Sequence, residues 1–381
     1  MEQILYILYI GFTQSLFAAL MIATKRNPQV ADRILAAWLF LIAIEMGFAL
    51  VNENIIRLYE FVFIPFTYGP LLYFYIRFLT NEEVKFHWTN WLHFIPFLLV
   101  FASAIVFRGK PVIRLDDFWS TDPFLSFRLI YGTSFFISVT TYSVIAFVLI
   151  SRHQKNIQNL FSYTSERITL SWLKFVAISF YVTYILVFIL GVFVIFNKES
   201  LPYNPTFVSY FGLTLFAFAF SVYGFKQPGI FHELYARSRT GRREVIEEKK
   251  AESKYERSGL KKEDAEEYRK RLLRYMKDKK PYLDGDLTIQ DISEQLDIPR
   301  HHLTQVINET LYKNFYTFIN EYRVEEVKKM LTDPEYQKYT LTSIAFEAGF
   351  NSKSSFNSVF KDLVGKTPTQ FREENNLLQQ V

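Results

Sequence analysis

The chain has 381 residues, of which 50% are hydrophobic and 18% aromatic, and its formal net charge is +5. That length is enough for two or three domains. The absence of cysteine excludes disulfides, thiol catalysis and cysteine-ligated zinc. The six histidines show neither a His-Glu-x-x-His nor a His-x3-His spacing, so we expect no metal site and no cofactor.

The charges are unevenly distributed along the chain. Residues 1–225 carry 15 Lys or Arg and 12 Asp or Glu, whereas the much shorter stretch 265–381 carries 17 and 18. The sequence therefore predicts an apolar N-terminal domain and a polar C-terminal one. Because the C-terminal stretch is nearly neutral, nucleic-acid binding there has to be argued from motifs rather than from a basic surface.

Seven N-terminal segments are long and apolar enough for membrane-spanning helices, which need about 20 mostly apolar residues. They are residues 4–23, 34–51, 58–79, 91–107, 127–150, 172–196 and 206–225. The second to fourth are interrupted by Glu45 or by prolines. The alternative for any one of them is the core helix of a soluble protein, but seven in 225 residues favour a membrane domain.

The loop charges indicate how the predicted domain is oriented. Lys25 and Arg26 follow the first segment, and loops on their side carry nine Lys or Arg against six on the other. Positive loops stay in the cytoplasm. We therefore expect a multi-pass protein of the inner (cytoplasmic) membrane, with its N-terminus outside and its C-terminal domain in the cytoplasm.

Two polar residues within the predicted spans are candidates for binding a small-molecule or membrane signal. They are Gln14 and Glu45; a carboxylate at membrane depth is costly and often functional. The alternative is a structural, hydrogen-bonded carboxyl. The outer loop 108–126 is a further candidate, or a plain connection.

Residues 226–264 form a charged connector between the domains. Arg237, Arg239, Arg242 and Arg243 follow the last span closely and would suit anionic lipid headgroups. A solvated linker explains the same composition.

The C-terminal stretch 265–375 has the helical pattern of two helix-turn-helix units. In the first unit, Thr288 and Asp291 resemble a capping box, and a turn at 297–299 precedes a helix that buries Leu303, Val306 and Ile307. The outer face of this helix can hydrogen-bond to DNA. Its residues are Arg300, His301, Thr304, Gln305 and Asn308.

The second unit follows a helix predicted over 314–331. Gly349 stands where a turn between helices needs a positive φ, and Ser352 can cap the next helix. Phe356, Phe360 and Leu363 are expected to face inward. The outward residues are Lys353, Ser354, Asn357 and Lys361. A last short helix starts at Thr367–Pro368, and 376–381 form a tail.

Several residues of this stretch match a known family pattern. They are Ile344–Ala345, Gly349–Phe350, Ser355–Phe356, Phe360–Lys361, Gly365, Thr367–Pro368 and Phe371–Arg372, with Phe318, Ile319, Asn320 and Arg323 before them. Residues 265–375 thus resemble the DNA-binding domain of the AraC/XylS regulators. The sequence departs from that pattern at Pro299, at Tyr312, which stands near a common glycine, and at Ser358, which stands where a basic residue is frequent.

The resemblance implies two recognition helices that read adjacent major grooves of promoter DNA. We therefore expect an all-α, membrane-anchored transcription regulator. It would couple a membrane or extracytoplasmic signal to sequence-specific binding of double-stranded DNA, and its further partners would be RNA polymerase and a second copy of the chain. The other reading is a transporter or channel whose helix-turn-helix domain is degenerate and serves protein interaction. No enzyme motif is present, and we expect no catalytic residues.

Overall fold

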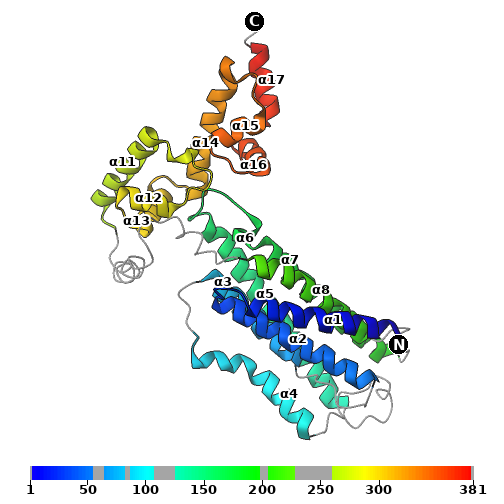
Figure 1. The fold of residues 1–381 in the computed structure, drawn as a ribbon. Helices are drawn as coiled ribbons and strands as arrows, with labels where there is room; N and C mark the ends of the chain where they lie inside the picture. Colours follow the sequence, from blue (N-terminus) through cyan, green and yellow to red (C-terminus); the bar gives the residue numbers. More distant parts are fainter. Residues whose placement is uncertain are drawn as a thin grey trace. The chain divides into compact units, whose positions relative to one another are not determined.

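A computed structural model describes residues 2–54, 64–81, 86–106, 125–197, 205–227 and 260–378. The regular elements in these ranges are all helices, as the sequence predicts. The same ranges contain one isolated antiparallel β-bridge, between Phe161 and Thr288. The chain divides into two compact units (Figure 1). The first comprises Met1–Arg152 and Leu170–Gly229, and the second His153–Thr169 and Ile230–Val381.

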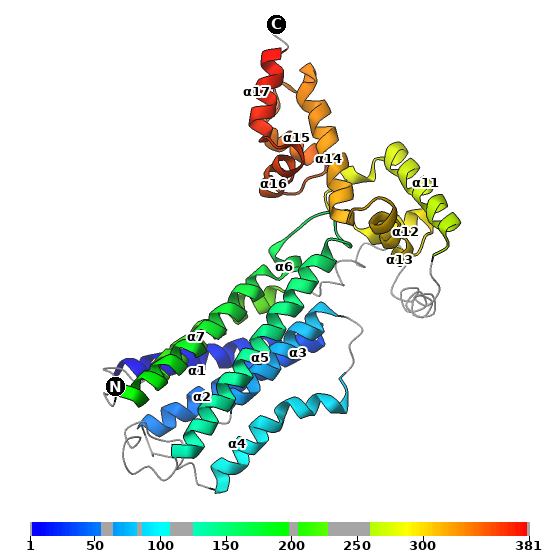
Figure 2. The same ribbon diagram turned by 180° about the vertical axis from the view of Figure 1, so that it is seen from behind.

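The first unit is a bundle of long apolar helices. They are α1 (Glu2–Ala23), α2 (Val30–Asn54), α3 (Tyr68–Thr80), α4 (Ile95–Val106), α5 (Leu125–Ile157), α7 (Ser171–Asn197) and α8 (Pro205–Ala219). Helix α1 packs against α2 and α8, and α8 also packs against α7 (Figure 1). Figure 2 shows α1 beside α2 from the opposite side. A 3₁₀ turn precedes α3 and another precedes α4, and a π-helical turn, Phe220–Gly224, extends α8.

Five helices of the described part are long and apolar enough to cross a membrane. These stretches are Ile4–Ala23, Val30–Val51, Leu129–Ile157, Ser171–Phe193 and Phe207–Gly224. The predicted spans 58–79 and 91–107 correspond to α3 and α4, which have 13 and 12 residues. The predicted number of seven is therefore not confirmed; residues 55–63 and 107–124, next to these two helices, lie outside the described ranges.

The interior of the first unit is aromatic. Trp38 of α2 is 1% exposed, and its ring centroid lies 5.1 Å from that of Phe220 and 6.0 Å from that of Phe180. Large apolar side chains also cover the outside of the bundle, among them Phe17, Phe175 and Val182. Helices that are apolar on every side are typical of a membrane interior or of a large buried core.

The second unit is built around one central helix. Its elements are α6 (Glu166–Thr169), α11 (Lys262–Lys279), α12 (Ile289–Leu296), α13 (Arg300–Gln305), which continues in a π-helical turn to Thr310, α14 (Phe315–Thr332), α15 (Leu341–Glu347), α16 (Lys353–Val364) and α17 (Pro368–Leu378). The first half of α14 packs into a core with α11, α12 and α13, and its second half into a core with α15 and α16.

Candidate DNA-binding surface

The first helix-turn-helix begins with the expected capping box. The Thr288 hydroxyl accepts a bond from the Asp291 N–H (3.3 Å), and the Asp291 carboxylate accepts one from the Thr288 N–H (2.8 Å). Asp297, the residue that follows α12, has a φ of +50°. The Ser293 hydroxyl then donates to the Ile298 carbonyl (2.7 Å), which fixes the tight turn into α13.

Helix α13 buries Leu303 and turns a polar face outward. Asn308, in the π-helical turn that follows, is exposed, while Arg300, Thr304 and Gln305 are half-buried. Thr304 donates to the Arg300 carbonyl (3.0 Å) and Gln305 to the Glu309 carboxylate (3.0 Å). To bind base edges, these two side chains would have to give up the hydrogen bonds that they already make within the helix.

His301 is placed differently from its neighbours. Both of its ring nitrogens are buried, and its ring centroid lies 4.2 Å from that of His302. His302 in turn stacks on Tyr268 of α11, with 5.8 Å between centroids. Burial lowers the pKa of His302, and the positive charge that His301 can carry lowers it further. His301 therefore packs on His302, which in turn rests on α11.

The second helix-turn-helix presents a more open face. Gly349 has a φ of +93°, as expected, and the Ser352 hydroxyl caps α16 by accepting from the Ser355 N–H (3.1 Å). The four outward residues expected on α16 are all exposed: Lys353, Ser354, Asn357 and Lys361. Phe356 and Phe360 are buried, but Leu363 is 43% exposed, so its predicted inward position is wrong. It lies in the last turn of α16, where Val364 rather than Leu363 packs against the core.

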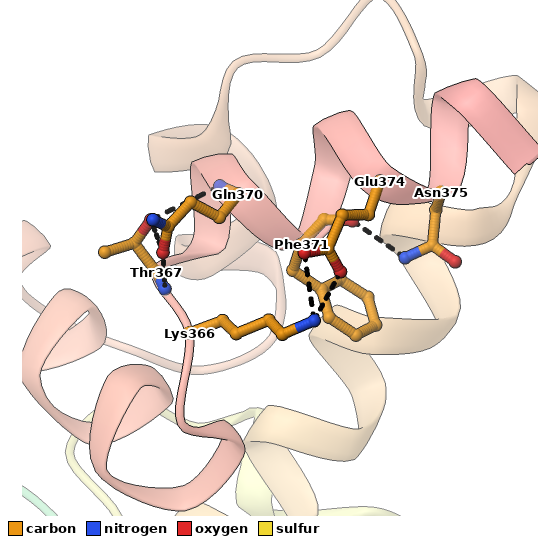
Figure 3. Close-up of polar contacts among 6 residues, drawn as sticks. All are labelled: Lys366, Thr367, Gln370, Phe371, Glu374 and Asn375. Atoms are coloured by element: carbon orange, nitrogen blue, oxygen red, sulfur yellow. Dashed lines mark hydrogen bonds and ion pairs between the residues drawn. The ribbon is translucent and has the colours of Figure 1, made fainter.

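Helix α17 closes the second core, and its first turn is held by reciprocal capping. The Gln370 side chain accepts from the Thr367 N–H (3.0 Å), and the Thr367 hydroxyl accepts from the Gln370 N–H (3.3 Å) (Figure 3). The Lys366 ammonium binds the Glu374 carboxylate one turn further on (2.7 Å). Phe371 packs edge-on against Phe360, with 5.6 Å between ring centroids, so α17 packs against the buried face of α16.

The two helix-turn-helix units also touch each other directly. A Cβ added to Gly349 would lie 2.2 Å from the Tyr282 carbonyl oxygen, which means that only glycine fits there. The Asn351 amide donates to the Asp286 carboxylate (3.3 Å) beside this contact. The spacing between the two units is thus set by α14 and by the turn 281–286 together.

Arg323 of α14 contributes to this junction although the apolar periodicity of the sequence gave no sign of it. Its side chain is 1% exposed and donates to the carbonyls of Tyr282 (2.8 Å) and Asp284 (2.7 Å). Its guanidinium lies 5.8 Å from the ring centroid of Phe350. The signal in the sequence was the family match at Arg323, which does not by itself say what the residue binds.

The two signal-binding candidates lie in the first unit and have different partners. The Gln14 amide donates to the Ser221 hydroxyl (3.0 Å), and the Tyr68 hydroxyl donates to the Glu45 carboxylate. Each thus joins two elements of the bundle. Loop 108–124 and the connector arginines, Arg237 to Arg243, lie outside the described residues.

Comparison with known proteins agrees with this geometry. Residues 292–374 match the family model described as a helix-turn-helix domain. The C-terminal unit carries a helix-turn-helix domain of the AraC type. The matched residues cover the turns of both helix-turn-helix units, the recognition-helix candidates α13 and α16, and most of α17.

The relatives of this helix-turn-helix domain are regulators. An uncharacterised HTH-type transcriptional regulator of Staphylococcus aureus (strain COL) is 37% identical over 87 residues, which are 23% of this chain and 11% of the relative. The Msm operon regulatory protein of Streptococcus mutans serotype c is 26% identical over 90 residues, 24% of this chain and 31% of that protein. The chain thus spans about a tenth of the length of the first relatives that it matches. No solved structure matches the chain.

Proposed function

We propose that the chain is a membrane-anchored, sequence-specific DNA-binding regulator of transcription. It would act as a one-component receptor, in which a signal at the first unit changes how the second unit binds promoter DNA. RNA polymerase, a second copy of the chain and the lipid bilayer are the further partners that this function requires or allows.

The observation that carries the proposal is the pair of helix-turn-helix units on a single helix. Helix α14 has 18 residues, which at about 1.5 Å per residue makes it about 27 Å long. Successive turns of the major groove lie about 34 Å apart. Because α13 and α16 are displaced from the two ends of α14, the distance between them suits adjacent major grooves on one side of a duplex.

The contacts to DNA would differ between the two helices. Lys353 and Lys361 are exposed cations and suit phosphates, whereas Ser354 and Asn357 suit base edges or sugar–phosphate oxygens. On α13 and the turn that follows it, the corresponding set is Arg300, Thr304, Gln305 and Asn308, with His301 the member whose ring nitrogens are buried. The nearly neutral charge of this domain makes these few cations important for affinity.

The membrane assignment is supported by the five apolar helices. An odd number of spans with the N-terminus outside leaves the C-terminal unit in the cytoplasm, where DNA is. The cationic loop residues Lys25 and Arg26 favour the same orientation. Gln14 and Glu45 remain our candidates for contact with the signal.

Genome-wide crosslinking and pull-down of the tagged full-length protein tests the function. The same experiment is run on a variant with Arg300→Ala and Asn357→Ala, and on Lys338→Ala, an exposed lysine outside both recognition helices. We expect discrete promoter peaks for the wild type and for Lys338→Ala, and none for the double variant. Absence of peaks for membrane-inserted wild-type protein, under several growth conditions, would favour a transporter or scaffold instead.

A further inference from the structure

The connection between α5 and α7 is folded into the second unit. Residues 153–169 link two helices of the first unit along the chain, yet they group with the helix-turn-helix domain. A His153 ring nitrogen lies 2.8 Å from the Ile168 carbonyl oxygen, and the Gln154 amide donates to the Thr169 carbonyl (3.0 Å). These bonds hold the two ends of the connection together, and residues 158–162 between them form what we call the docking segment.

The docking segment pairs with the beginning of α12 through its main chain. The Ser162 N–H donates to the Leu287 carbonyl (3.1 Å), and the Leu160 carbonyl accepts from the Ile289 N–H (2.9 Å), on either side of the bridge between Phe161 and Thr288. Ile289 is the first residue of α12, and its N–H has no acceptor within its own helix. The segment supplies that acceptor.

The same segment also meets the beginning of α14. The Gln158 carbonyl accepts from the N–H of Tyr316, in the first turn of this helix (2.9 Å). The Gln158 side chain accepts from the amide of Asn314, the residue that caps α14 (3.1 Å). One short stretch of chain thus caps both the supporting helix of the first helix-turn-helix and the helix that joins the two units.

Ser162 is the most deeply held residue of the segment. It is fully buried, and its carbonyl accepts from Arg323 (2.8 Å) and from Asn320 (3.1 Å). A second guanidinium nitrogen of Arg323 donates to the Ser162 hydroxyl (2.9 Å). Without Ser162 these buried donors would lose their acceptors, which is costly in a protein interior. The docking segment is therefore an integral part of the folded second unit.

We propose that the docking segment is the link through which α5 and α7 control DNA binding. This inference rests on the proposed function. The bonds described above go to α12, to α14 and to the turn before α12, and none of them goes to α13 or α16. The docked segment therefore leaves the recognition faces uncovered and holds the helices that support them. Docking favours DNA binding, and a displacement of α5 against α7 that pulls the segment away weakens it.

The first test measures docking by thiol protection in the full-length protein. The chain has no cysteine, so Ser162→Cys introduces a single, nearly isosteric thiol. N-ethylmaleimide should label it at least about tenfold more slowly than the exposed Ser358→Cys, because opening must precede reaction. Equal labelling rates in folded, membrane-inserted protein would overturn the inference.

The second test asks whether docking controls DNA binding. The variant Gln158→Ala/Ser162→Ala removes three side-chain bonds to the helix-turn-helix domain, and Asn156→Ala changes an exposed side chain of the same connection. At equal levels of inserted protein, we expect promoter occupancy to fall at least about threefold in the double variant and to stay at the wild-type level in Asn156→Ala.

The outcomes separate the inference from the proposed function. Wild-type promoter peaks that persist undiminished in the Gln158→Ala/Ser162→Ala variant, but vanish in Arg300→Ala/Asn357→Ala, would overturn the inference and leave the function standing. A wild-type protein without peaks would overturn both the function and the control of DNA binding by the segment, whatever the labelling rates say about docking.

Discussion

Gly349 lies so close to Tyr282 that a single added carbon would reach within 2.2 Å of the Tyr282 carbonyl oxygen. This contact joins the turn of the second helix-turn-helix to the 3₁₀ turn before the first. We predict that Gly349→Ala destabilises the C-terminal unit by more than about 2 kcal/mol, because it adds both a clash and a strained positive φ. Pulse proteolysis in urea, read through a C-terminal tag, measures the loss.

Gly365→Ala is the matched control for this prediction. Gly365 also has a positive φ, +78°, but a Cβ there meets nothing within 4 Å. We therefore expect only the backbone cost, about 1 kcal/mol. Equal losses in the two variants would show that backbone strain alone, and not the contact with Tyr282, makes Gly349 necessary.

Tyr312 allows the reverse substitution, in which glycine replaces a larger residue at a positive φ. Its φ is +56° and its side chain is 88% exposed, so it bears the strain of the left-handed region with little packing in return. We predict that Tyr312→Gly raises the free energy of unfolding by about 0.5–1 kcal/mol, after the greater chain entropy of glycine is deducted. A lower urea midpoint for Tyr312→Gly would mean that the tyrosine makes a contribution that its exposure does not suggest.

Glu326 should make the stability of the C-terminal unit depend on pH. Burial acts to raise its pKa, but the hydrogen bond and charge of Lys280, the charge of Lys329 and the Tyr282 hydroxyl together lower that pKa below its usual value of 4.5. A carboxyl whose pKa is lower in the folded state stabilises the fold above its unfolded pKa. This contribution is lost as the pH falls through the folded pKa.

We therefore expect the urea midpoint of the wild type to fall below about pH 4.5, and we expect Glu326→Gln to remove part of that slope. Glu325→Gln is the control, since Glu325 pairs with Lys328 on the exposed side of α14. The assignment fails if the Glu325 and Glu326 variants show the same pH profile.

Lys361 should contribute to DNA affinity through a phosphate. Once crosslinking has supplied an operator, we predict that Lys361→Ala weakens binding to all sequences alike and makes the slope of log K against log salt shallower by about 0.9. Lys366→Ala is the control because the Lys366 ammonium is held by Glu374 (2.7 Å). An unchanged salt slope in Lys361→Ala, measured by fluorescence anisotropy, would exclude a phosphate contact.

Much of the C-terminal unit is determined by the sequence itself. The capping box of Thr288 and Asp291, the Ser352 cap, the positive φ of Gly349 and the bounds of α14 all follow from residues within a few positions of one another. Hydrogen bonds at helix ends and the period of apolar side chains are local physics, so they can be read without knowing the fold. Hydropathy likewise indicated the apolar N-terminal helices, although five rather than seven meet the length in the described part of the chain.

The tertiary structure alone decided which distant segments meet. Hydropathy placed Ser162 between two predicted spans, and the helical period placed Arg323 on a helix. Nothing in the sequence related the two residues across 161 positions, where they form a buried hydrogen bond. Nor did it show that the ring nitrogens of His301 are covered or that Leu363 is exposed. A local pattern fixes which face of a helix is apolar, but the side chains and carbonyls that cover that face come from elements whose positions only the packed chain determines.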